Sequence, residues 1–175
     1  MAQAGTVTPV TSSAAAAPRA LRGLPSLVAS LVLVGIVATV AGRLGSADTA
    51  WYRALDKAPW NPPGWAFGAA WSVLYIGMGV AAWLVLRQGL DRAAVRAGLA
   101  LHLLQLALNL AWTGIFFGAE RPGLALLDLA ALTVVVAVMA VAFSRVSRTA
   151  AWLQAPYLVW LLFAASLNAW IVAAN

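Results

Sequence analysis

Residues 124–143 read LALLDLAALTVVVAVMAVAF, a run of 20 residues in which Asp128 carries the only charge. Spanning the hydrocarbon core of a bilayer takes about 20 helical residues, so this run is long enough to cross it. Its apolar residues are continuous, whereas a strand of a transmembrane β-barrel would alternate apolar and polar side chains. The run therefore predicts a membrane-spanning helix.

Four further apolar runs of comparable length occur in the chain. Together the five runs predict membrane-spanning helices at about 24–42, 65–86, 93–117, 124–143 and 150–174. Hydrophobic residues make up 63% of the chain and charged residues only 9%, against about 25% charged residues in a typical soluble domain. We therefore expect an all-α integral membrane protein, with one domain at residues 24–175 that forms a bundle of five transmembrane helices.

The rest of the composition limits the possible chemistry. Residues 1–23 are rich in Ala, Ser and Thr and predict a flexible tail, because they bury too little apolar surface to fold. The chain has no cysteine and one histidine, His102, so we expect neither a metal site nor a cofactor. The net charge of +6 lies in the connecting segments, as is typical of membrane anchoring. We expect contact with membrane lipid and no binding of nucleic acid.

The distribution of Lys and Arg predicts an orientation. Seven arginines lie in the tail and in the second and fourth connections, and four basic residues lie on the other side of the membrane. In an inner membrane, the side with more positive charge faces the cytoplasm. The chain is expected to be a multi-pass membrane protein; in an inner membrane, such as a bacterial cell membrane, its N-terminus would be cytoplasmic and its long first loop outside.

Special residues gather in residues 51–75, WYRALDKAPWNPPGWAFGAAWSVLY, which contain four of the nine tryptophans and three of the eight prolines. Asn61 followed by Pro62 predicts the N-cap and first residue of the second helix. Pro156, inside the fifth run, predicts a kink because it removes a backbone hydrogen bond.

Polar and aromatic residues of three helices fall in the half of the membrane nearest the first loop. They also share helix faces, with spacings of three and four residues: Trp71, Tyr75 and Met78; Gln105, Asn109, Trp112 and Phe116; and Tyr157, Trp160, Ala164 and Asn168. Amides in hydrocarbon need partners and should face the interior. The pattern predicts an aromatic cavity beneath the first loop.

Several of these residues also have simpler interpretations. Trp and Tyr commonly anchor helices at the membrane surface, and this interpretation suits the tryptophans near helix ends: Trp51, Trp60, Trp65, Trp152 and Trp170. Gln105 and Asn109 fit helix-to-helix hydrogen bonding as well as ligand contact. Asp128 predicts an ion pair with Arg53, Lys57 or Arg121, and His102 predicts a core histidine.

In order along the chain, the motifs are WYRALDKAPWNPP from Trp51, Trp71 with Leu74 and Tyr75, QLALNLAW from Gln105, and PYLVWLLFAASLN from Pro156. This pattern resembles the tryptophan-rich sensory protein family, also called the TspO or translocator protein family. The resemblance covers residues 24–175 and all five expected helices. It implies a five-helix bundle, often a homodimer, that binds porphyrins and haem-like tetrapyrroles under its first loop.

The resemblance also implies particular residues for the site. The family's ligand-binding positions correspond to Tyr52, Pro62, Trp71, Tyr75, Asn109, Trp112, Trp160 and Ala164. Trp71 and Trp160 resemble the pair implicated in light-dependent porphyrin breakdown in some bacterial relatives, so they are the catalytic candidates if the chain is an enzyme. No Lys or Arg follows Tyr157, as the cholesterol-recognition pattern of the animal proteins requires, and this departure disfavours cholesterol as a ligand.

Three functions stay open at this point. The first is a membrane receptor, sensor or transport-related protein that binds a tetrapyrrole. The second is a light-dependent enzyme that degrades porphyrin oxidatively. The third, a passive structural bundle, is disfavoured by the concentration of interior amides and aromatic rings.

Overall fold

The computed structural model describes residues 23–45 and 49–175. The tail expected at residues 1–23 lies, except for Gly23, outside the described residues. The described part is all-helical, and five of its segments are long and apolar enough to cross a membrane: Leu24–Leu44, Gly64–Leu86, Ala93–Gly118, Pro122–Ser144 and Arg148–Ala174. The predicted fold class and the five spans are confirmed.

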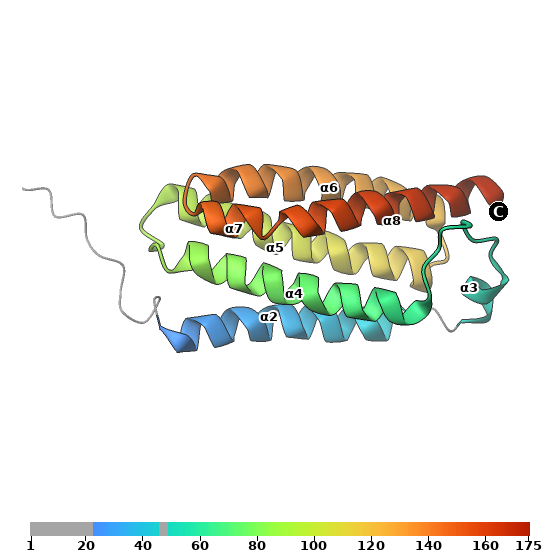
Figure 1. The fold of residues 1–175 in the computed structure, drawn as a ribbon, viewed down its shortest axis with the longest axis horizontal. Coiled ribbons are helices and arrows are strands. Elements are labelled where there is room, and N and C mark those ends of the chain that lie inside the picture. The colour runs from blue at the N-terminus through green and yellow to red at the C-terminus, as the bar shows by residue number, and fades with distance from the viewer. Residues whose placement is uncertain (1–22, 46–48) are drawn as a thin grey trace, which may run out of the picture.

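The helices run up and down, and the connection after the first span lies at the same end of the bundle as the last residues of the chain (Figure 1). The elements are α2 (Leu24–Leu44), α3 (Ala50–Ala54), α4 (Gly64–Leu86), α5 (Ala93–Thr113), η1 (Gly114–Gly118), α6 (Pro122–Ser144), α7 (Arg148–Trp152) and α8 (Ala155–Ala174). Helix α5 packs on α6, α2 on α4, and α6 on α8. The short helix α3 lies over the end of the bundle.

The surface of the bundle is apolar, as a lipid-facing surface must be. Large side chains such as Val73, Leu127, Val134 and Val159 are each more than 60% exposed. The interior is tightly packed at the end away from α3, where Val85, Val95, Val136 and Phe143 are fully buried.

The start of the second span differs from the prediction. Helix α4 begins at Gly64, with Pro63 in extended backbone as its N-cap, rather than at Asn61 and Pro62. The residue before a proline is sterically disfavoured in the helical region. Because Pro63 follows it, Pro62 is kept out of the helix.

The third and fifth spans are not single α-helices. The third continues beyond Thr113 as the π-helix η1, in which the Ala119 N–H donates to the Gly114 carbonyl at 2.8 Å. In the fifth span, α7 ends at Trp152 and α8 starts at Ala155, with Pro156 in the first turn of α8. Proline is tolerated in a first turn, so the expected kink is instead a break between two helices.

Close packing of α5 against α6 depends on Gly98. A Cβ at this position would lie 3.1 Å from two carbon atoms of the buried Phe143 ring. Adding a side chain here would push the two helices apart or displace the ring.

Gly98→Val should therefore lower the stability of the purified protein by about 1–3 kcal/mol, the usual cost of overpacking a core. The measurement is thermal unfolding in detergent, followed by circular dichroism. Gly123→Val is the matched control, since no atom lies within 4 Å of a Cβ built there. Equal melting temperatures for the two variants would contradict the role assigned to Gly98.

Candidate functional site: an aromatic cavity beneath the first loop

A cavity of about 720 Å³ lies between α2, α4, α5 with η1, and α8. Its volume falls within the range of about 300–1,000 Å³ that is usual for small-molecule sites. Tyr52 of α3 and Asn61 of the following segment also line it. The cavity therefore extends to the first loop, at the end of the bundle where the sequence predicts a site.

One wall of the cavity is formed by α2. Most of it consists of small residues, at Gly35, Ala38, Ala41 and Gly42, together with Leu31 and Val34. A Cβ built on Gly35 or Gly42 would meet no atom within 4 Å, so these positions face open space. This wall presents mainly backbone and methyl groups.

The walls formed by α4, α5 and η1 are aromatic. The rings of Trp71 and Tyr75 lie 5.4 Å apart, inclined by 32°, and those of Trp112 and Phe116 stack at 5.1 Å and 19°. All four residues line the cavity, as does Phe117. A slot bounded by small residues and aromatic faces suits a flat, apolar molecule.

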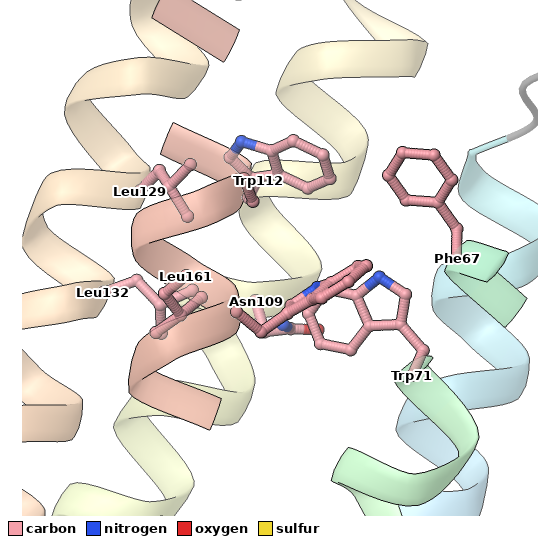
Figure 2. Close-up of a pocket in the computed structure, with 9 residues that line it drawn as sticks. Phe67, Trp71, Asn109, Trp112, Leu129, Leu132 and Leu161 are labelled. Atoms are coloured by element: carbon pink, nitrogen blue, oxygen red, sulfur yellow. The ribbon is translucent and has the colours of Figure 1, made fainter. Parts of the chain in front are cut away.

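A smaller recess of about 30 Å³ adjoins the cavity. It shares Phe67, Trp71, Asn109, Trp112 and Ala164 with the cavity, and its remaining lining residues are Leu129, Leu132, Trp160 and Leu161. Figure 2 shows Phe67 and Trp71 together on α4, with Leu129, Leu132 and Leu161 on the opposite side. The recess thus extends from the cavity toward α6.

A chain of buried hydrogen bonds lies behind the cavity wall and reaches the cavity at Tyr75 and Asn109. The Tyr75 hydroxyl donates to Asn109 Oδ1 at 2.7 Å, and Asn109 Nδ2 donates to the Tyr157 hydroxyl at 3.3 Å. That hydroxyl donates in turn to Gln105 Oε1 at 3.2 Å. Gln105 Nε2 lies 3.4 Å from His102 Nδ1, so the chain connects α4, α5 and α8.

A second set of hydrogen bonds fixes Trp112. Its indole N–H donates to Asn168 Oδ1 at 3.2 Å, and Asn168 Nδ2 donates to the Pro122 carbonyl at 2.8 Å. The side chain of Asn168 therefore joins α8 to the start of α6 and sets the plane of the Trp112 ring.

The first loop covers the cavity through aromatic contacts. Tyr52 meets Phe117 at a centroid distance of 5.4 Å, and Trp51 meets Phe116 at 5.6 Å. Burial raises the pKa of the Tyr52 phenol above its ordinary value, and a hydrogen bond with Asn61 opposes that rise. The phenol therefore stays protonated at neutral pH and keeps its hydroxyl donor.

The loop is also fastened to α8. The Asp56 N–H donates to Asn175 Oδ1 at 3.0 Å, and Asn175 Nδ2 donates to the Asp56 carbonyl at 3.2 Å. The Trp60 indole N–H donates to Ser166 Oγ at 3.3 Å, and its ring lies 5.2 Å from that of Trp170.

Most of the residues predicted for the site lie around this cavity. Six line it: Tyr52, Trp71, Tyr75, Asn109, Trp112 and Ala164. Trp160 lines the recess only. Pro62 lines neither space, although its neighbours Asn61 and Gly64 line the cavity.

The sequence interpretation placed Phe116 of η1 on the cavity face but missed the contribution of α2. That interpretation considered polar and aromatic residues. Helix α2 contributes mainly small residues, and their small size leaves room for the cavity. A signal was present, because Gly35, Ala38 and Gly42 are spaced by three and four residues and lie on one helix face. Phe67, Phe117 and Leu167 were also missed.

Three simpler expectations can also be compared with the structure. The expected ion pair of Asp128 is wrong, since its Oδ2 is buried without a hydrogen-bond partner and no ion pair to it occurs within residues 23–45 and 49–175. His102 is a core residue, 2% exposed. Among the tryptophans assigned to membrane anchoring, Trp65 and Trp152 are each 76% exposed, as anchoring requires.

Replacing Tyr157 tests the hydrogen-bond chain. Tyr157→Phe leaves both Gln105 Oε1 and Asn109 Nδ2 without their partner, and an unsatisfied buried polar group costs about 1–3 kcal/mol. Tyr75→Phe leaves only one such group, Asn109 Oδ1, so its loss should be about half as large. The free energy of unfolding of each variant in detergent measures the difference. An equal loss of stability in both variants would contradict the two hydrogen bonds assigned to the Tyr157 hydroxyl.

Comparisons with known proteins agree with this architecture. A model of the TspO/MBR family matches residues 27–173. The chain is 41% identical to the tryptophan-rich protein TspO of Chlorobaculum tepidum, over 71% of this chain and 79% of the relative. It is 45% identical to the human translocator protein, over 67% and 70% of the two chains. Identity to the tryptophan-rich sensory protein of Cereibacter sphaeroides is 40%, over 79% and 84%. This integral, multi-pass membrane protein belongs to the TspO/MBR family.

Proposed function

We propose that the chain is a receptor, sensor or transport-related protein that binds a tetrapyrrole, such as protoporphyrin or a haem-like molecule, in the cavity under its first loop. The observation that carries this proposal is the slot between the small-residue face of α2 and the aromatic rings of α4, α5 and η1. A porphyrin is a rigid, flat, aromatic macrocycle. Stacking between its faces and tryptophan rings is favourable because aromatic pairs contribute beyond the area that they bury.

The polarity of the slot also fits such a ligand. None of the described residues that line it carries a charge, so it favours the apolar ring and disfavours the carboxylates of a porphyrin. Those groups would stay at the mouth beside Tyr52, where the Lys57 ammonium lies 5.0 Å from the centre of the Tyr52 ring. Arg53 lies on the same short helix. The mouth thus offers positive charge to the propionates.

Membrane context and assembly complete the proposal. The proposed location is a bacterial cell membrane, and in such a membrane the arginine distribution favours an N-terminus in the cytoplasm and the α3 end outside. A homodimer is supported by exposed alanines on α5, at Ala93, Ala97, Ala107 and Ala111, because small residues four apart allow close helix approach. Cholesterol is a less suitable ligand, since no basic residue follows Tyr157.

Replacing Trp71 tests the proposal. The purified protein is titrated with protoporphyrin, and binding is followed by the shift of the porphyrin absorbance. Trp71→Leu should raise the Kd by about tenfold, because it removes an aromatic stacking face worth on the order of 1 kcal/mol or more.

The matched control is Trp152→Leu, which changes an exposed tryptophan of α7 outside the cavity. It should leave the Kd unchanged. The proposed site would be wrong if both variants bind as tightly as the unchanged protein.

A second candidate function is light-dependent oxidative degradation of the bound porphyrin, with Trp71 and Trp160 as the catalytic residues. It is favoured by the contact between the two rings, whose centroids lie 6.3 Å apart at 80°. Trp71 lines the cavity, so it would meet the ligand directly, and Trp160 lies behind it.

Illumination of the complex in air tests this candidate. A new absorbing product should appear, and Trp71→Phe or Trp160→Phe should each slow its formation at saturating porphyrin. Bleaching at the same rate by free porphyrin in detergent, with no new product, would exclude this function.

A further inference from the structure

The recess between α4, α6 and α8 has a chemistry of its own. Its floor is made by Leu129, Leu132 and Leu161, each at most 2% exposed, and its sides by Trp71 and Trp160. It opens toward the slot through the residues that the two spaces share. A branch of a molecule bound in the slot can therefore reach the recess.

The polar atoms around the recess are already engaged or enclosed. Both ends of the Asn109 amide are hydrogen-bonded to tyrosines. The Trp160 indole nitrogen is buried within the protein and has no partner among the described residues. A carboxylate in the recess would lose its hydration without gaining a counter-charge, which is costly. The recess suits an uncharged, apolar group.

The volume sets the size of that group. One water-sized atom needs about 10–15 Å³ of such space, and the recess offers about 30 Å³. It therefore accommodates about two non-hydrogen atoms. A two-carbon branch, such as an ethyl or vinyl group, fits this size.

We infer that the recess is a specificity subsite that takes a two-carbon apolar branch of the macrocycle, and so orients the ring with its propionates toward the mouth. This inference rests on the proposed tetrapyrrole binding and adds to it the class of porphyrin preferred. Porphyrins with short alkyl or vinyl branches bind more tightly than those with hydrogen or a charged group at the same positions.

Two porphyrins that differ only at those positions test the inference. Mesoporphyrin carries ethyl groups where deuteroporphyrin carries hydrogen. Burying two carbon atoms should make mesoporphyrin bind about five to fifteen times more tightly to the unchanged protein. Because the ratio of the two Kd values is taken within each variant, a general loss of affinity cancels.

Filling the recess should remove the preference. Leu132→Phe fills it from α6 and Leu161→Phe from α8, and in either variant the ratio should fall at least threefold. Val134→Phe, on the exposed face of α6, is the matched control and should keep the full ratio. Thermal unfolding identifies which variants are folded.

Three results would overturn the inference, and only one of them would also contradict the proposed tetrapyrrole binding. Equal binding of both porphyrins by the unchanged protein excludes the subsite while leaving tetrapyrrole binding intact. If folded Leu132→Phe and Leu161→Phe keep the full ratio of the two Kd values, the preference for ethyl groups arises elsewhere in the slot and not in the recess. Failure of the unchanged protein to bind either porphyrin removes the proposed function and the subsite with it.

Discussion

The site depends on the hydrogen bonds that Tyr157 makes with Asn109 and Gln105. In a bilayer, unpaired amides are costly because no water is available to satisfy them. The Tyr157 hydroxyl accepts from one amide and donates to the other, and Tyr75 completes the chain. Three helices are thereby held in one register, and the aromatic rings on the same helix faces are fixed beside them. The chain of polar groups is thus a structural requirement of the cavity, whatever ligand occupies it.

The cavity lies at one end of the bundle because α2 presents mainly small residues there to the aromatic side chains of the other helices. Near the other end, Gly98 and Gly79 allow close helix packing, with a Cβ on Gly79 lying 2.8 Å from a Leu31 methyl. Beyond that crossing, α2 presents Gly35, Ala38 and Gly42 to open space rather than to a neighbouring helix. The π-helix η1 widens the backbone at the same end and places Phe116 and Phe117 against the first loop. A π-helical turn of this kind is common at functional sites.

The spans were predictable because hydropathy depends only on composition along the chain, and the shared faces of α4, α5 and α8 were predictable from spacings of three and four. The contact between Tyr75 and Asn109 joins two of those faces. Other features depend on three-dimensional context. The cavity wall on α2 consists mainly of small residues, which a search for polar and aromatic residues does not detect. The π-helix and the break before Ala155 arise from backbone geometry. That Asp128 has no ion pair within the described residues could not be foreseen, because sequence spacing does not fix which basic residues reach it.

The central claim is that the slot between α2 and the aromatic rings holds the macrocycle. Its most direct test is an experimental structure of the protein in lipid with protoporphyrin bound. The account predicts the ring between the glycine and alanine face of α2 and the side chains of Trp71 and Trp112, with its carboxylates toward α3. A macrocycle bound on the lipid-facing surface, with the slot closed or filled by lipid, would contradict it.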